Sequence, residues 1–166
     1  MFALKPLSHE SVPSALAKAE HYRHLNEPAE AESICRDILE IAPSNECALV
    51  CLILSLSDQI SHDRHAFPQA EKLLQQLQGE YERAYYGGIL WERRAKARHH
   101  EAAQGARHTV YEWIVKALEH FQVAEHLRPP GNDDALLRWN TCVRYLNRHH
   151  ELTPAAEDIP APILSE

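Results

Sequence analysis

The chain has 166 residues, 45% of them hydrophobic and 25% charged, which is close to the composition of ordinary globular domains. This composition excludes disorder of the whole chain, and the length predicts one domain with a single core. There are 17 Lys and Arg residues against 24 Asp and Glu residues, so the net charge is −7. That charge argues against nucleic acid or an anionic membrane as the main partner. Scarce glycine and abundant Ala, Leu, Glu, Gln and Arg predict an all-α fold.

Prolines divide the first part of the chain into predicted helices, because proline is tolerated in the first turn of a helix but not in its interior. We expect helices over residues 15–25 and 29–41. A third helix is expected over residues 48–56, capped by Ser44 or Asn45. This third helix is apolar on nearly all sides, which predicts that it is buried between neighbours and forms the centre of the core.

The middle of the chain predicts a loop, a short helix and a long helix. Turn formers and charges without apolar periodicity predict the loop over residues 57–67. Pro68 is expected to begin a fourth helix and Gly79 to end it. Apolar residues then recur at helical spacing, which predicts one long helix over residues 80–103 with a break at Gly105.

Two more helices, over residues 109–127 and 133–149, complete the predicted domain. The residues that follow are rich in proline and acids and lack periodicity, which predicts an extended or disordered tail. We therefore expect a lead-in over residues 1–12, a single helical domain over 13–150 and a tail over 151–166.

The sequence shows neither a signal peptide nor an apolar run long enough to span a membrane, so we expect a cytoplasmic protein. The four cysteines, Cys35, Cys47, Cys51 and Cys142, lack the C-x-x-C spacing of zinc and redox sites. We expect them to be reduced and mostly buried, and we read Cys47 and Cys51 as small core residues of one apolar helix.

Two parts of the chain have the residue spacing of a repeated helix hairpin. Tyr22, Ala31 and Pro43 resemble the tyrosine, small residue and closing proline of the tetratricopeptide repeat (TPR). The segment 117–129 matches the small, aromatic, small, proline spacing of that repeat more closely. Between these two parts, a degenerate middle repeat resembles the same pattern at Ala70, Leu74 and Leu77. Gly88 and Trp91 resemble the glycine and tyrosine positions in the first helix of the third repeat.

The resemblance implies a right-handed α-α superhelix of about three antiparallel helix hairpins, followed by a C-terminal capping helix and the extended tail. The repeat lengths are irregular, so insertions must lie in the loop after the third helix and near Gly105. An irregular helical bundle that contains one such hairpin is the alternative.

TPR-like geometry places the first helix of each hairpin on a concave surface. The residues that would project there are mostly apolar, which implies a groove for a helix or an extended hydrophobic segment of a partner. The predicted binding residues are Leu16, Glu20, Cys47, Val50, Cys51, Leu54, Tyr85, Tyr86 and Ile89.

Basic residues gather near the end of the long predicted helix, and we call this set the basic tip. It consists of Arg93, Arg94, Lys96, Arg98 and Arg107. Solvated helix ends and a contact for an acidic peptide or a phosphate backbone both explain it. Trp91 and Trp113 are expected to pack between helices.

Twelve histidines are unusually many for this length. His21 and His24 have the spacing of two ligands on one helix face, but no further ligand stands at a fixed offset from them. The remaining pairs are interpreted as solvated polar residues: His62 and His65 in a loop, His99 and His100 near the basic tip, and His149 and His150 at the end of the last helix. We therefore predict no metal ion and no cofactor.

Nothing in the sequence resembles a catalytic motif, so we predict a non-enzymatic adaptor that binds another protein or peptide in the apolar groove. A histidine-based metal-binding or enzymatic domain is one alternative, and a structural self-association module is another. The sequence does not indicate the oligomeric state.

Overall fold

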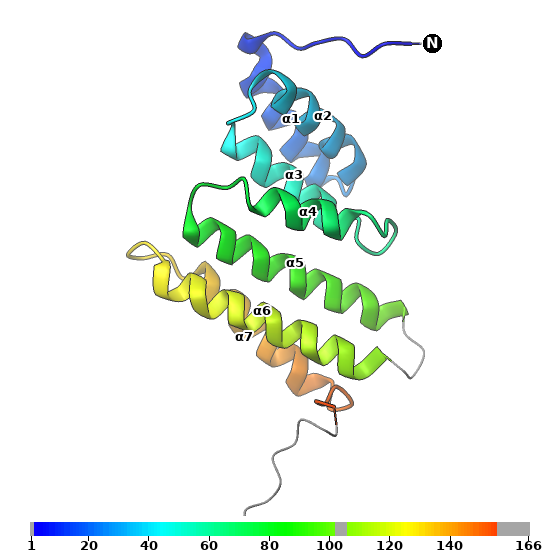
Figure 1. Ribbon diagram of the computed structural model, residues 1–166, viewed down its shortest axis with the longest axis vertical. Helices are drawn as coiled ribbons and strands as arrows, with labels where there is room; N and C mark the ends of the chain where they lie inside the picture. The colour runs from blue at the N-terminus through cyan, green and yellow to red at the C-terminus, as the bar shows by residue number, and fades with distance from the viewer. Residues whose placement is uncertain (1, 102–105, 156–166) are drawn as a thin grey trace, which may run out of the picture.

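A computed structural model describes residues 2–101 and 106–155. The described residues form seven α-helices and one short 3-10 helix, with no strand among them, so the fold is all-α as predicted. The helices follow one another along the long axis of the molecule (Figure 1). Their bounds are Val12–His24 (α1), Pro28–Ile41 (α2), Glu46–Asp58 (α3), Ala66–Leu74 (α4), Glu80–Glu101 (α5), Arg107–Leu127 (α6) and Asp134–Arg148 (α7), with the 3-10 turn at His9–Ser11.

The helix starts reflect local chemistry. Pro13 lies in the first turn of α1, where its missing N–H costs nothing, and the helix begins three residues before the predicted start. Asn45 caps α3 as expected, because its side chain accepts a hydrogen bond from the backbone N–H of Ala48 at 2.9 Å. Helix α3 also continues past the predicted end, to Asp58.

The predicted bounds of the fourth helix are wrong at both ends. Helix α4 begins at Ala66, so Pro68 lies within its first turn rather than at its start. Backbone N–H groups in the first turn have no intrahelical partner, which is why proline is tolerated there. The helix ends at Leu74 rather than at Gly79, and Leu77 is nevertheless buried in the core from the turn that follows.

Two large hydrophobic clusters and a small third one form the interior, and the third consists of Ala84, Ala124 and Ala135. Side chains of α1 to α4 make the first, and Leu90 of α5 contributes to it. Helices α5, α6 and α7 make the second, together with Leu152 from the segment after α7. Three of the four thiols are buried as predicted; Cys47 is exposed, so its interpretation as a core residue is wrong.

Helices α5 and α6 lie closest where α5 carries Gly88. A Cβ atom on Gly88 would lie only 2.5 Å from a ring carbon of Phe121, which is fully buried. Ala117 and Ala124, the predicted small positions of α6, are also fully buried. Trp91 and Trp113 meet with ring centroids 6.2 Å apart, as expected for residues that pack between helices.

We expect Ala117→Leu to lower the free energy of unfolding by about 1–3 kcal/mol, because a larger side chain overpacks a closed interface. Ala117 is fully buried in the second cluster. Thermal unfolding measures the loss, and Glu119→Leu on the exposed face of the same helix is the control. Equal melting temperatures for the parent protein and Ala117→Leu would contradict the packing of α6.

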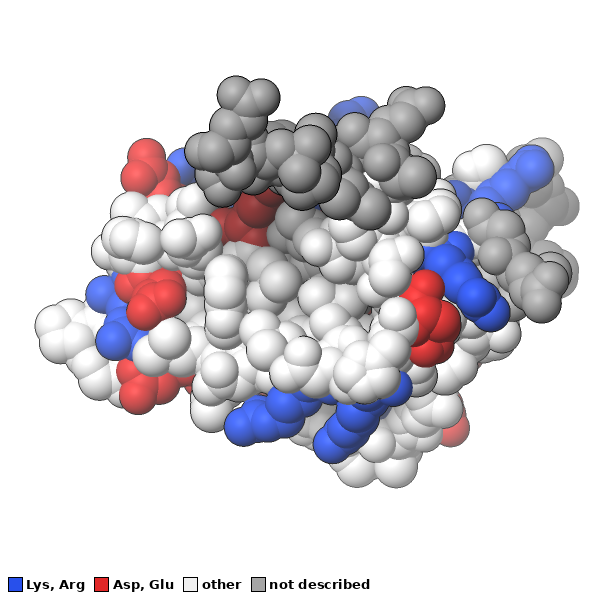
Figure 2. Space-filling model, turned by 90° about the horizontal axis from the view of Figure 1, so that it is seen from below, with Lys and Arg blue, Asp and Glu red and all other residues white. Residues whose placement is uncertain are grey.

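Figure 2 shows the end of the molecule that includes α7, with uncharged side chains over much of the middle of this face and charged side chains of both signs toward its border. Leu137 of α7 is 62% exposed. The expected break at Gly105 and the tail from residue 156 onward lie outside the described residues.

Candidate functional site

A cavity of about 290 Å³ opens between α1, α3 and α5, and we call it the groove. Its floor and walls come from successive turns of α3, because residues four apart on a helix share a face. Helix α1 supplies one rim and α5 contributes a tyrosine. The lining residues are Glu20, Arg23, Glu46, Cys47, Val50, Cys51, Leu54 and Tyr86.

The groove assembles most of the residues predicted for the concave surface. Glu20, Cys47, Val50, Cys51, Leu54 and Tyr86 all line it. Three predicted residues do not, because they face the interior or another helix: Leu16 packs on the first hydrophobic cluster, whereas Tyr85 and Ile89 belong to the second.

Sequence reasoning missed two lining residues, Arg23 and Glu46. Arg23 lies three positions after Glu20, so the helical period placed it on the same face of α1. Glu46 starts α3 just before the predicted Cys47. Both residues could have been found by adding to the predicted binding residues the charged residues next to them on the same helices.

An ion-pair network fixes one end of the groove. Asp58, at the end of α3, accepts from Arg23 of α1 at 2.9 Å and from Arg93 of α5 at 2.5 Å. Arg93 also donates to the Ser57 hydroxyl and, at 3.3 Å, to the carbonyl of Leu54. Burial lowers the pKa of Arg93, whereas the neighbouring Asp58 carboxylate opposes that shift. The charge of Arg23 is therefore already paired within the fold.

Negative charge dominates the remaining rim of the groove. Glu20 is exposed and forms no ion pair with the described residues. Glu46 accepts a hydrogen bond from the backbone N–H of Gln78 at 2.8 Å, which leaves its other oxygen available. The groove thus combines an apolar floor with two carboxylates at its edge.

Two thiols meet at the floor of the groove: Cys51, which lines it, and Cys35 of α2. A hydrogen bond from the Cys35 thiol lowers the pKa of Cys51, and the same contact raises the pKa of Cys35. Both residues are buried, whereas Cys47, one turn before Cys51 in α3, is exposed. Cys47 is therefore the thiol that a reagent in solution reaches first.

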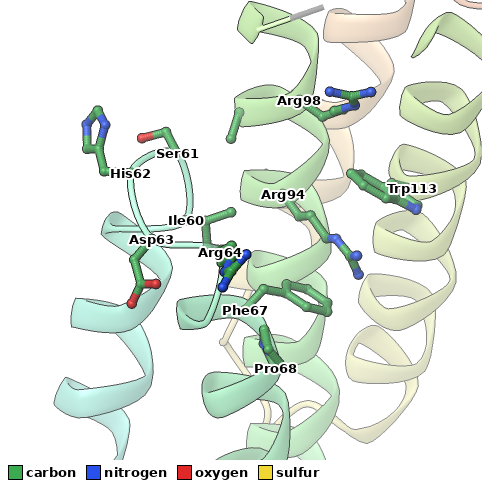
Figure 3. A pocket seen from close by; sticks show the side chains of 11 residues that line it. Ile60, Ser61, His62, Asp63, Arg64, Phe67, Pro68, Arg94, Arg98 and Trp113 are labelled. Carbon is green, nitrogen blue, oxygen red and sulfur yellow. The ribbon is translucent and has the colours of Figure 1, made fainter. Parts of the chain in front are cut away.

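A second cavity, of about 390 Å³, lies between the loop after α3, helix α5 and Trp113 of α6, and we call it the basic pocket. Figure 3 shows the side chains of Arg94 and Arg98 on its α5 side and the loop residues opposite them. The Arg94 guanidinium lies 4.0 Å from the ring centroid of Phe67 and 4.1 Å from that of Trp113. Arg94 is therefore held by two aromatic faces, which is a stabilising cation–π arrangement.

The structure divides the predicted basic tip among separate contacts. Arg93 pairs with Asp58 and Arg94 lies against the two aromatic rings. Lys96 contacts the buried Glu92 at 2.5 Å, and Arg98 and Arg107 are exposed. Neighbouring residues of a helix point in different directions, so the adjacent charges do not form one surface.

Two histidines that the sequence analysis interpreted as solvated are engaged in contacts. The side chain of His99 is 19% exposed and that of His149 is 35% exposed. Both lie beside Glu151, and this is the one group of three metal-ligating side chains found among the described residues. His21 and His24 are not part of such a group.

Within the part of the chain that the structure describes, no helix combines the length and apolar character required to cross a lipid bilayer. Comparison with protein-family models, with curated protein sequences and with solved structures gave no match. The structure therefore defines the fold class: this is an all-α protein in which helices pack on helices.

Proposed function

We propose that this chain is a TPR-like protein-binding module that holds a short amphipathic helix of a partner in the groove. The observation that supports this function most directly is the composition of one cavity: apolar side chains from α3 and α5 form the floor, and unpaired carboxylate oxygens stand at the rim. A groove of this kind accepts an apolar helix face, and its charges select the flanking residues.

The arrangement of the helices supports the TPR-like part of the proposal. Each helix contacts the next along the chain, and α3 also contacts α1 and α5. These are the first helices of the three hairpins in the predicted register. Their shared side is where a stacked-hairpin protein presents its binding surface.

Charge complementarity defines the partner. Asp58 is shared by Arg23 and Arg93, so these three groups together carry one net positive charge, whereas Glu20 and Glu46 bring two negative charges to the rim. The rim therefore keeps a negative excess. A partner helix with leucines on one face and lysines or arginines beside them matches both the floor and the rim. An acidic helix of the same apolar content is repelled.

The test uses two fluorescent amphipathic peptides with the same leucines, one carrying lysines and the other glutamates. We expect the full chain to bind the lysine peptide about fivefold more tightly, because exposed ion pairs each contribute about 0.2–1 kcal/mol. Val50→Glu places a charge on the floor and should abolish binding. Leu137→Glu, on the exposed face of α7, is the matched control and should bind normally.

Alkylation of Cys47 locates the bound peptide. Cys47 is exposed in the groove, so a saturating lysine peptide should slow its reaction with iodoacetamide, as read by mass spectrometry. Equal alkylation rates with and without the peptide, or unchanged peptide binding by Val50→Glu, would show that the groove is not the binding site.

A further inference from the structure

Three metal-ligating side chains from distant parts of the chain meet near the end of α5. His99 is in the last turn of α5, His149 directly follows α7, and Glu151 lies two residues further. One potential ligand atom from each residue lies within 4.8 Å of the other two. We propose that His99, His149 and Glu151 bind a divalent transition-metal ion, with Zn²⁺ as the ion to test first.

The distances match those of a metal site. The Glu151 Oε1 atom lies 3.4 Å from His99 Nε2 and 3.0 Å from His149 Nδ1. Around a tetrahedral zinc ion with bonds of about 2.0–2.2 Å, two ligand atoms stand about 3.4 Å apart. The three side chains therefore need only small rotations to converge on one ion.

A neighbouring tyrosine orients the first ligand. The Nδ1 atom of His99 lies 2.5 Å from the Tyr145 hydroxyl oxygen, with which it forms a hydrogen bond. When Nδ1–H donates to that oxygen, the lone pair of the ring is on Nε2, which faces Glu151. Metal-binding histidines commonly have their second ring nitrogen held in this way. In the other neutral tautomer the tyrosine hydroxyl donates to Nδ1 and Nε2–H points to Glu151, so metal binding selects the tautomer with the proton on Nδ1.

The backbone that carries the other two ligands is also held in place. The N–H of His149 bonds to the carbonyls of Tyr145 and Leu146 at the end of α7. On the far side of Glu151, Leu152 is 5% exposed and is packed in the second hydrophobic cluster. The ligands thus belong to a preformed arrangement, which reduces the entropy lost when an ion binds.

The ligand set favours borderline transition metals. Two imidazole nitrogens and one carboxylate oxygen suit Zn²⁺, Ni²⁺ or Cu²⁺, whereas Mg²⁺ and Ca²⁺ prefer oxygen ligands alone. Three protein ligands leave a coordination position for water. The side chain of Glu151 is 37% exposed, which gives the ion a path from solvent. The bound ion would fasten the segment after α7 to α5.

The site is independent of the groove, which is formed by α1, α3 and the first half of α5. If the peptides do not bind, the proposed metal site is not contradicted. If Zn²⁺ does not bind, the proposed peptide-binding function of the groove is not contradicted.

The test is calorimetric titration of Zn²⁺ into the metal-free full chain carrying no histidine tag. We expect each chain to bind one Zn²⁺ ion tightly. We also expect the affinity for Zn²⁺ to fall at least tenfold in both His99→Ala and Glu151→Gln, because each variant removes a ligand. The matched controls are His100→Ala and His150→Ala, which remove exposed histidines adjacent to the ligands and should bind Zn²⁺ as the parent does.

Two further measurements separate binding from folding. Tyr145→Phe keeps all three ligands and should weaken Zn²⁺ binding about tenfold, through loss of the hydrogen bond to His99. Hydrogen exchange should slow on Zn²⁺ addition at residues 149–153 in the parent but not in Glu151→Gln. Parent-like affinity in both ligand variants, or equal losses in the His100 and His150 controls, would overturn the proposal.

Discussion

Replacing both Lys96 and Arg138 with methionine is expected to lower the free energy of unfolding by about 3–5 kcal/mol. The carboxylate of Glu92 in α5 is only 2% exposed and is held by Lys96 at 2.5 Å and by Arg138 of α7 at 3.5 Å. Methionine keeps an apolar stem of similar length but removes the charge. The Glu92 carboxylate would then be buried without a counter-ion. Urea unfolding at pH 7 measures the loss.

A triple variant separates lost charge pairing from lost packing. Adding Glu92→Met to the double variant removes the stranded carboxylate, and buried ion pairs replaced by apolar residues of similar volume are often neutral or stabilising. We therefore expect the triple variant to be clearly more stable than the double variant. If the double variant unfolds at the same urea concentration as the parent protein, Glu92 does not depend on these two cations.

The fold class could be predicted because the signals for helices are local. Prolines, a capping asparagine and apolar residues at helical spacing act within a few positions of one another. The same local signals misplaced the end of α3, where Ser57 and Asp58 were assigned to a loop. Asp58 is helical and pairs with arginines of α1 and α5. Partners that far away in sequence are invisible to a local reading.

The groove was largely predictable because it repeats along one helix. Cys47, Val50, Cys51 and Leu54 share one side of α3, so helical spacing alone groups them. Tyr85 and Tyr86 show where this reasoning ends. They are adjacent in α5, yet only Tyr86 lines the groove, because the crossing of α5 on α6 decides which of the two faces it.

The cluster of His99, His149 and Glu151 could not be found from spacing. Metal motifs are recognised when two ligands stand a few residues apart, and here α6 and α7 separate the first ligand from the others. His149 and Glu151 are two positions apart, a spacing that places two side chains on one face of a strand but not of a helix, and the sequence predicts no strand there. Only the packing of α7 against α5 and α6 brings the three together.

Gly88→Val is expected to lower the free energy of unfolding by about 3 kcal/mol, at the upper end of overpacking costs. Even the first added carbon would lie 2.5 Å from a ring carbon of Phe121, and that ring is fully buried. The ring has no free space to enter, so α5 and α6 must separate. Valine is only slightly better than glycine in a helix, and this gain is too small to offset the clash. Thermal and urea unfolding both measure the change.

The adjacent glycine provides the matched control. A Cβ atom on Gly87 would meet the imidazole of His120 at 2.8 Å, but that side chain is only half-buried and can rotate away. Gly87→Ala also gains about 1 kcal/mol of helix propensity, so its net effect on stability should be small. Adding Phe121→Leu should partly rescue Gly88→Val, because leucine lacks the outer ring atoms that clash. Equal losses in Gly87→Ala and Gly88→Val, with no rescue by Phe121→Leu, would mean that α5 and α6 do not cross at Gly88.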